Sequence, residues 1–349
     1  MTLLYAAMED VLLVAAGEGD DWADATALAE TDPECVAAAA AEPHRVFVGT
    51  FSSGLYRSTD GGEQFEQVVD ANWRAGPDSE RVGGPVTAVT VSPHDPEEVW
   101  VGTEPSRLYR STDGGDSFEP VGGLVDLPSA DQWSFPPRPD THHVRWIEVD
   151  PTDPDRVLVG IEAGALVLTT DGGETWQERP EGARRDNHQL ATHSEAAGRV
   201  YAAAGDGFAE SRDGGETWGH PQRGLDHRYV WSVAVDPGDA DTVLVSAASG
   251  AHRAHSTDGA ESYVYRRTAP GPGGDPGEAA WTPLDDRGLP TGRGVLRAVL
   301  AAGEAPGELF AVNNHGVFHT ASAGDRWRSL PVGWRDRFAE QTCRGLAVV

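Results

Sequence analysis

The chain has 349 residues, 39% of them hydrophobic, which is enough for a substantial buried core, and its formal net charge is -29. All 27 cationic side chains are Arg, and so large an excess of acid excludes the broad basic face that nucleic acids require. An acidic surface of this extent is typical of proteins that stay soluble in concentrated salt, so we expect a halophilic protein that does not bind nucleic acid.

The cysteine content and the first residues indicate the compartment. Cys35 and Cys343 form neither a zinc pattern nor a disulfide framework. The N-terminal stretch lacks a cationic segment, carries Glu9 and Asp10 in its apolar part, and never reaches 18 uninterrupted apolar residues. We therefore expect a cytoplasmic monomer with no membrane span.

In chain order, short apolar or alternating runs follow one another, separated by turns rich in Pro, Gly and Asp. The runs at 2–8, 10–17 and 22–28 are followed by a copy of a longer unit at 36–68. The clearest unit contains four runs, at 86–92, 98–104, 107–113 and 117–121, and further copies begin at Val144, His188, Val230 and Val295. Runs of this length and spacing predict strands, repeated as a four-stranded unit.

The two ends of the chain complete the pattern. The first copy lacks its first run, and an orphan run, RGLAVV at 344–349, ends the chain. Supplying the missing strand from the other end closes a β-propeller and removes exposed sheet edges. The sequence predicts an all-β, single seven-bladed β-propeller with four-stranded blades, closed by the C-terminal strand. The predicted blades are 344–349 with 1–30, 35–70, 85–123, 143–180, 187–220, 229–284 with an insertion at 266–280, and 294–332.

The stretch RSTDGG occurs twice, from Arg57 and from Arg110, with looser copies such as LTTDGGETW. These copies resemble the Asp-box, or bacterial neuraminidase (BNR), repeat, of general form S/T-x-D-x-G-x-T-W/F, and the resemblance covers nearly the whole chain. A carboxylate in such a turn accepts backbone N–H groups while Gly supplies a positive φ. We therefore expect structural roles for the box residues Asp60, Asp113, Asp171, Asp213 and Asp258.

The resemblance implies a fold more strongly than a function. In Asp-box proteins the boxes lie opposite the usual site. The Arg-Ile-Pro element of Asp-box sialidases is absent, so a sialidase is not expected. The repeat is similar to that of family-74 xyloglucanases, which have two propellers, and to sortilin-type repeats. In size it is closest to the photosystem II stability and assembly factor-like propellers, which use an Arg-rich face to hold a protein client.

A binding site is predicted on the face formed by the loops that join each blade to the next and by the loops between second and third strands. The loops between blades hold 13 of the 27 Arg, and the first strands begin with more polar or aromatic residues. Such a collar suits an anionic or carbohydrate-like ligand, or an acidic segment of a protein, unless its Arg only pair with local acids. The predicted ligand-binding residues are His143, Arg145, Asn187, His188, Arg228, Tyr229, Trp231, Arg293, Arg297, Asn314, His315 and Arg344.

Two chemical alternatives concern the same mouth. Glu104, Glu162 and Asp206 lie in loops of adjacent blades and are candidates for acid and base in glycoside cleavage, or else solvated loop acids. His142, His143, His188 and His227, with Glu162 or Asp206, are candidate ligands of a divalent metal, or else histidines that hydrogen-bond loops. The sequence therefore favours a binding or assembly protein, with a hydrolase or lyase as the alternative and a scaffold without a pocket as a third possibility.

Overall fold

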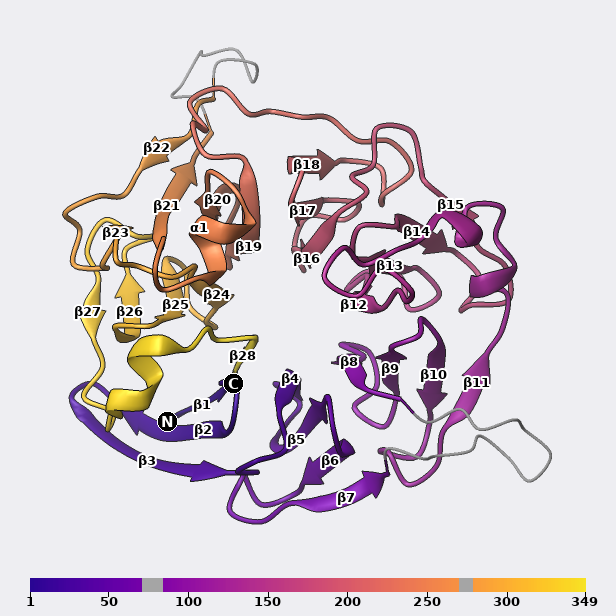
Figure 1. Cartoon of the computed structure of the whole chain (residues 1–349), viewed down its shortest axis with the longest axis horizontal. Coiled ribbons are helices and arrows are strands. Elements are labelled where there is room, and N and C mark those ends of the chain that lie inside the picture. The colour runs from indigo at the N-terminus through magenta and orange to yellow at the C-terminus, as the bar shows by residue number, and fades with distance from the viewer. Residues whose placement is uncertain (71–83, 270–278) are drawn as a thin grey trace.

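The computed structural model describes residues 1–70, 84–269 and 279–349, and within them seven β-sheets are arranged around a central axis (Figure 1). Neighbouring strands in each sheet are antiparallel, and the first strand of each copy lies nearest the axis. The predicted all-β, seven-bladed propeller is confirmed.

The strands of the first four blades follow the repeat read from the sequence. Their bounds, from the axis outward, are β28 (Gly345–Val348), β1 (Thr2–Ala7), β2 (Leu12–Glu18) and β3 (Asp21–Ala27); β4 (Pro33–Ala39), β5 (Glu42–Thr50), β6 (Gly54–Ser58) and β7 (Glu66–Val69); β8 (Val86–Val91), β9 (Val99–Thr103), β10 (Leu108–Ser111) and β11 (Glu119–Val121); and β12 (Val144–Val149), β13 (Val157–Ile161), β14 (Ala165–Thr169) and β15 (Gln177–Glu178).

The last three blades are less regular. The fifth has three strands, with an isolated bridge between Glu210 and Gly219 in place of the fourth. In the sixth, two short strands pair with the third one. The bounds are β16 (Asn187–Thr192), β17 (Val200–Ala204) and β18 (Gly207–Ser211); β19 (Tyr229–Asp236), β20 (Asp239–Ala248), β21 (Glu261–Arg267), β22 (Thr282–Pro283) and β23 (Gly292–Arg293); and β24 (Val299–Ala302), β25 (Glu308–Asn313), β26 (Gly316–Ala321) and β27 (Arg328–Ser329).

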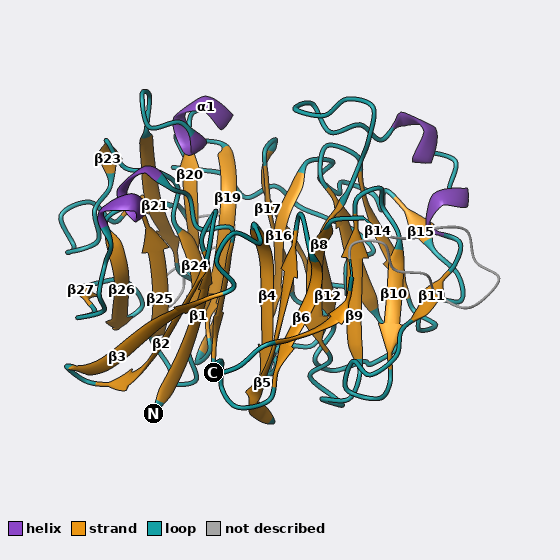
Figure 2. Cartoon of the chain, turned by 60° about the horizontal axis from the view of Figure 1, so that its bottom comes forward, coloured by secondary structure: helices purple, strands orange, loops and turns teal. Residues whose placement is uncertain are grey.

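Short helices lie in the loops. They are η1 (Leu124–Asp126), η2 (Ala130–Gln132), α1 (Ala251–His255) and η4 (Asp336–Glu340). Figure 2 shows α1 standing at one rim of the ring, above β20 and β21. In the part of the chain that the structure describes, no helix has the length and apolarity needed to cross a membrane.

The ring is closed by the two ends of the chain. β28 pairs antiparallel with β1, and Leu4 lies opposite Val348. The backbone N–H of Arg344 also donates to the carbonyl of Ala7 over 2.7 Å. The N- and C-termini lie close together in the first blade (Figure 1). The predicted closing strand is confirmed.

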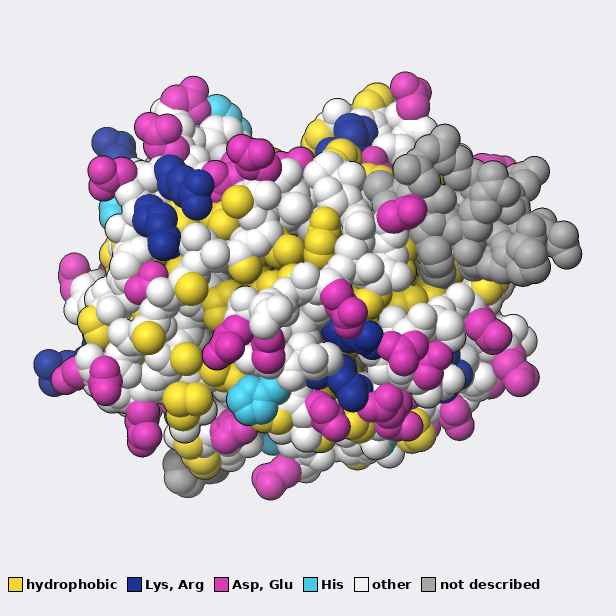
Figure 3. All heavy atoms as spheres, turned by 90° about the horizontal axis from the view of Figure 1, so that it is seen from below, with side chains coloured by type: hydrophobic (Ala, Val, Ile, Leu, Met, Phe, Trp, Pro, Cys, Tyr) yellow, Lys and Arg dark blue, Asp and Glu magenta, His cyan; other side chains and the backbone are white. Residues whose placement is uncertain are grey.

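The buried core consists of clusters between neighbouring blades. Trp100, from the third blade, is fully buried and belongs to one cluster with Val144 and Val157 of the fourth. On the side drawn in Figure 3, acidic side chains are scattered over the surface, with a few groups of Arg between them. Because each sheet packs against the blades on both sides of it, both of its faces are buried, which explains the continuous apolar runs of the middle strands.

Four of the predicted Asp-box turns share one hydrogen-bond pattern. In the third blade the Ser111 hydroxyl donates to Asp113 Oδ1 over 2.7 Å and accepts from Gly115 N over 2.9 Å, and Asp113 Oδ1 accepts from Ser117 N over 2.9 Å. The hydrogen bonds from Ser117 and Ser111 lower the pKa of Asp113 to about 2. The same contacts recur at Asp60, Asp171 and Asp213. They support the structural role expected for these four residues.

The fifth predicted box, at Asp258, differs from the others. The preceding residues form α1 rather than a strand, and the turn leads into β21, the third strand of its blade. The Asp258 side chain is exposed and has an ion-pair contact with His252 at 3.6 Å. The box assignment of Asp258 is therefore corrected: this turn lies between the second and third strands of its blade. Of the predicted insertion at 266–280, β21 includes 266–267, and 270–278 fall outside the described residues.

Candidate functional site

The inner strands share an irregularity where each one begins. Near the start of β4, β8, β12, β16 and β19, one residue is skipped in the pairing with the second strand of the blade, so the register shifts there. A bulge redirects one side chain out of the regular alternation. With the equivalent positions just before β24 and β28, these residues form what we call the axial ring: Glu34, Thr87, Arg145, His188, Trp231, Arg297 and Arg344.

Contacts between neighbouring blades hold members of the axial ring in place. The Thr87 hydroxyl donates to the carbonyl of Val144 over 2.6 Å, and His188 Nδ1 lies 2.8 Å from the carbonyl of Val230. In both cases the carbonyl belongs to the residue that precedes the ring member of the next blade. Thr87 and His188 are thus held by the inner strand of the adjacent blade rather than by a loop.

A cavity of about 560 Å³ lies at this end of the central channel. Six of the seven axial-ring residues line it, and the exception, His188, is 1% exposed. Loops between blades and α1 complete the wall, through Phe135, Arg138 and His255. A pocket of this size can enclose a small ligand or the end of a peptide.

Cationic side chains surround one indole in this cavity. The guanidinium of Arg297 lies 3.7 Å from the ring centroid of Trp231, and that of Arg145 lies 5.0 Å from it. Arg297 is 2% exposed, and burial, together with the charge of Arg145, lowers its pKa to about 9. Its Nη1 donates to the Cys343 carbonyl over 2.5 Å. Within the described residues, no carboxylate forms an ion pair with Arg297.

The neighbours of Arg297 are held in defined states. Arg297 Nε donates to His255 Nδ1 over 3.1 Å, which leaves the imidazole hydrogen on Nε2, where it faces the Tyr229 hydroxyl at 3.0 Å. Burial and then the charge of Arg297 lower the pKa of His255 to about 2. Arg344 forms an ion pair with Glu34. Burial raises the pKa of Glu34, and the charge of Arg344 lowers it by less.

A chain of charged groups forms the opposite wall. Arg138 binds Glu104 through two hydrogen bonds of 2.8 and 2.6 Å. His143 lies between Glu104 and Glu162, with Nδ1 3.8 Å from the first and Nε2 3.0 Å from the second. Burial alone would raise the pKa of Glu162, but the His143 hydrogen bond and the nearby charges hold it at about 2. Glu162 therefore stays ionised at neutral pH.

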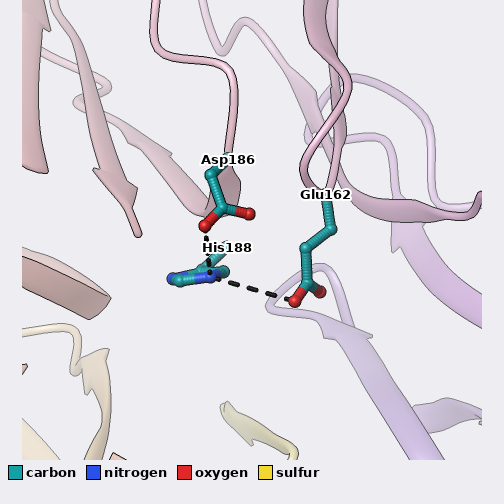
Figure 4. A group of neighbouring side chains, drawn as sticks. All are labelled: Glu162, Asp186 and His188. Atoms are coloured by element: carbon teal, nitrogen blue, oxygen red, sulfur yellow. Dashed lines mark ion pairs between the residues drawn. The ribbon is translucent and has the colours of Figure 1, made fainter. Parts of the chain in front are cut away.

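Glu162 also belongs to a second cluster, with Asp186 and His188 (Figure 4). Both carboxylates point toward the imidazole edge in that view, from a loop after β13 and from the residue before β16. His188 Nε2 lies 3.9 Å from Glu162 Oε1 and 3.8 Å from Asp186 Oδ2. These three residues could hold a metal ion.

The structure brings together only part of the predicted site. Of the twelve predicted ligand-binding residues, His143, Arg145, Tyr229, Trp231, Arg297 and Arg344 line the cavity, and His188 lies behind its wall. Arg228, Arg293 and His315 are exposed and do not line it. Asn187 and Asn314 are buried, and their amides donate to the carbonyls of Arg184 and Gly294. The expectation that these five residues line the site is therefore corrected, because none of them lines the cavity.

The residues predicted as metal ligands and as catalytic acids do not all lie together. His227 Nδ1 lies 2.5 Å from the Tyr265 hydroxyl and its ring stacks on Tyr263, while His142 Nδ1 accepts a 3.4 Å hydrogen bond from a backbone N–H. Asp206 is half exposed and lies 3.9 Å from Arg184, outside the cavity wall. His227 therefore does not join His143 and His188, as the predicted histidine and carboxylate site required. Of the two carboxylates offered for that site, Glu162 lies beside His143 and His188, and Asp206 lies outside the cavity wall.

Sequence reasoning missed several wall residues. They are Glu34, Thr87, Asp186 and His255, whereas Phe135 and Arg138 come from the loops between blades that were expected to form the collar. Glu34 and Thr87 occupy the axial-ring position of their blades, so an alignment of the repeats by strand start would have found them. Asp186 precedes its strand by one residue, and His255 lies in a helix that the repeat does not contain.

A second cavity, of about 400 Å³, continues along the channel. Inner-strand side chains line it, many of them Ala or Val, and Arg145 and Arg344 border both cavities. Glu148 is one of its polar residues, and burial raises its pKa to about 7. The charged groups are thus concentrated at the α1 end of the channel.

Comparisons with known proteins agree with the fold. No known family profile matches the chain. A xyloglucanase from Paenibacillus sp is 26% identical over 281 residues, which cover 70% of this chain and 25% of that protein. An oligoxyloglucan-reducing end-specific xyloglucanase from Emericella nidulans is 27% identical over 136 residues, covering 38% and 15%. The chain thus spans no more than about a quarter of the length of these two relatives.

Solved structures show the same likeness. A GH74 enzyme from Niastella koreensis superposes with a TM-score of 0.61 and 15% identity, covering 93% of this chain and 53% of that one. YCF48 bound to D1 peptide superposes with a TM-score of 0.56 and 15% identity, covering 86% and 81%. At these identities the likeness establishes the seven-bladed propeller that this chain shares with GH74 and YCF48 structures.

Proposed function

We propose that the chain is a binding or assembly protein that holds an anionic ligand, most simply an acidic segment of a protein client, in the cavity at the α1 end of the channel. We further place it among Asp-box propellers of halophilic organisms, as a cytoplasmic monomer. The curated relatives are named as xyloglucanases, and one structural neighbour as bound to a peptide, so both ligand classes have precedents in this fold.

One observation carries the proposal: the guanidinium of Arg297 lines the cavity, is almost fully buried, and has no carboxylate partner among the described residues. A buried charge without a counterion is costly, and a bound carboxylate would compensate it. Arg145 lies beside it, and its contact with Glu162 is long, at 3.8 Å. Guanidinium groups next to an indole suit a planar carboxylate, which they can bind through paired hydrogen bonds.

The test is calorimetric titration of the folded protein with an acetylated hexaglutamate peptide, and with hexaglutamine as the uncharged probe. We expect binding of the acidic peptide only, weakened more than about tenfold in Arg297→Gln and in Arg145→Gln. Arg326→Gln is the matched control, because Arg326 is exposed on the seventh blade. Equal affinity in Arg297→Gln and Arg326→Gln would refute the assignment of the cavity.

A glycoside hydrolase is the second candidate, because Glu104 and Glu162 flank the same imidazole. Their carboxylates lie no more than about 9 Å apart, which admits the separations of both retaining and inverting enzymes. Glu162, however, is held ionised, so it is not suited to donate a proton, and Glu104 is bound by Arg138 through two hydrogen bonds. Release of reducing ends from xyloglucan by the wild type, and not by Glu162→Gln, would establish the hydrolase instead.

A further inference from the structure

We propose that Glu162, Asp186 and His188 bind a divalent transition-metal ion, with zinc the best fit, in the wall of the cavity. This inference does not depend on the anionic ligand proposed above, because it concerns a separate set of atoms. It keeps His188 and Glu162 of the histidine and carboxylate site expected from the sequence, but Asp186 takes the place of the other histidines.

The first argument is the spacing of the donor atoms. One atom from each side chain lies within 4.8 Å of the other two, and the two contacts of His188 Nε2 are 3.8 and 3.9 Å (Figure 4). Ligands bonded to zinc at about 2.1 Å in a tetrahedron stand roughly 3.4 Å apart. The two contacts of His188 would need to shorten by about 0.5 Å, and the distance between the two carboxylate oxygens, which is within 4.8 Å, by up to about 1.4 Å.

The second argument is the unpartnered imidazole nitrogen. The ring of His188 is 1% exposed, and Nδ1 donates its hydrogen to the Val230 carbonyl over 2.8 Å. In neutral His188 the lone pair of Nε2 therefore faces two carboxylates, and within the described chain Nε2 has no hydrogen-bond partner. A buried acceptor aimed at two anionic oxygens is unfavourable without a cation between them.

The third argument is that each candidate ligand is oriented by an outer group. The Val230 carbonyl fixes the tautomer of His188, His143 Nε2 hydrogen-bonds Glu162 Oε2, and the N–H of Ala163 donates to Asp186 Oδ1 over 2.9 Å. Glu162 Oε1 and Asp186 Oδ2 remain for the ion. Such outer contacts are characteristic of metal-binding histidines and carboxylates.

Gly205 makes the position of Asp186 possible. A Cβ atom on Gly205 would lie 1.8 Å from Asp186 Oδ2. The backbone N–H of Gly205 also donates to the Asp186 carbonyl over 2.8 Å. The absence of a side chain at 205 therefore lets the carboxylate stand over the imidazole.

The donor set selects the kind of ion. One imidazole and two carboxylates suit zinc or a similar first-row divalent ion, whereas calcium and magnesium prefer oxygen ligands alone. Glu162 and Asp186 line the cavity, so a fourth coordination position would open into it. Three protein ligands with an open position are the arrangement of zinc sites that accept water or an exogenous ligand.

The test uses the folded full-length chain, purified without a histidine tag and stripped with a chelator. Titration with zinc chloride, followed by calorimetry and elemental analysis, should give about one tightly bound ion per chain. Cobalt, titrated as a spectroscopic probe, should give visible absorption bands that zinc abolishes. Failure to bind zinc at near-stoichiometric concentration would overturn the proposal, whatever the outcome of the peptide titration.

Variants separate this site from adventitious binding. Asp186→Asn keeps Oδ1 available to Ala163 and should weaken zinc binding more than about tenfold, as should Glu162→Gln. Gly205→Ala changes no ligand and should weaken binding by about 10- to 100-fold by displacing Asp186. His227→Gln and Asp206→Asn are the matched controls and should bind as the wild type does. Unchanged binding in both Asp186→Asn and Glu162→Gln would refute the assignment.

Discussion

Replacing Ser111 by Ala tests whether the turns with the shared Ser, Asp and Gly hydrogen bonds hold the ring together. The Ser111 side chain is 1% exposed, and its oxygen accepts hydrogen bonds from the N–H groups of Gly115 and Asp113 over 2.9 and 3.3 Å while it donates to the Asp113 carboxylate. Ala would leave the buried Gly115 N–H without a partner. Such a loss costs about 2–3 kcal/mol in the free energy of unfolding.

The corresponding change in melting temperature follows from the size of the chain. At about 2.1 cal/mol/K per residue, the unfolding entropy of 349 residues is roughly 0.7 kcal/mol/K, so Ser111→Ala should melt about 3–4 °C lower. Ser117→Ala makes the same chemical change in the same turn, but it removes an exposed hydroxyl, so its effect should stay within about 1 °C.

Differential scanning calorimetry in high salt would measure both variants, and the cobalt and peptide titrations would show whether the cavity is intact. Equal shifts in Ser111→Ala and Ser117→Ala would refute the reasoning, because they would show that burial of the hydroxyl does not decide its contribution. Loss of ligand binding without a change in melting temperature would instead assign the turn to the site.

Three further predictions concern charged groups. Asp171→Ala should lower the melting temperature and leave peptide affinity unchanged, because its carboxylate accepts hydrogen bonds only within its own turn; calorimetry and the peptide titration check both. Hydrogen bonds lower the pKa values of Asp113 and Asp171 to about 2, so they stabilise the folded protein above the unfolded pKa of about 3.9. This stabilisation should be lost as the pH falls from 4 through 2. In an acid titration, the stability of Asp171→Asn should therefore fall less steeply with pH than that of the wild type. Arg297→Met should raise the melting temperature while abolishing peptide binding, since it removes a buried, unpaired cation; a lower temperature would show that the hydrogen bond to Cys343 outweighs the charge.

The fold was predictable because each blade repeats the same chemistry at the same spacing. The group Ser111, Asp113 and Gly115 marks a turn type that recurs in four blades, and the repeated apolar runs around it predicted the strand order and the number of blades. The error at Asp258 has a physical cause. Ser, Asp and Gly favour tight turns in general, and nothing in those letters distinguishes a turn after the third strand from one before it.

The site was predictable only where it follows the repeat. Arg145, Trp231 and Arg297 occupy one equivalent position per blade, so the beginning of each inner strand located them. Asp186 could not be found in this way, because its contact with Glu162 depends on the loop around Ala163, whose φ of 53° is left-handed. Such a backbone turn at a non-Gly residue is not encoded by a recognisable pattern.

Arg344 links the cavity to the completion of folding. It immediately precedes β28, so its guanidinium enters the cavity wall only after the last strand has paired with β1. A chain whose ends have not met has six blades and an open gap in the wall, and it lacks one of the cations that would hold an anion. A ligand that contacts Arg344 therefore binds the closed ring in preference to the open one. Its binding free energy then stabilises the pairing of β28 with β1, which is where the ring closes.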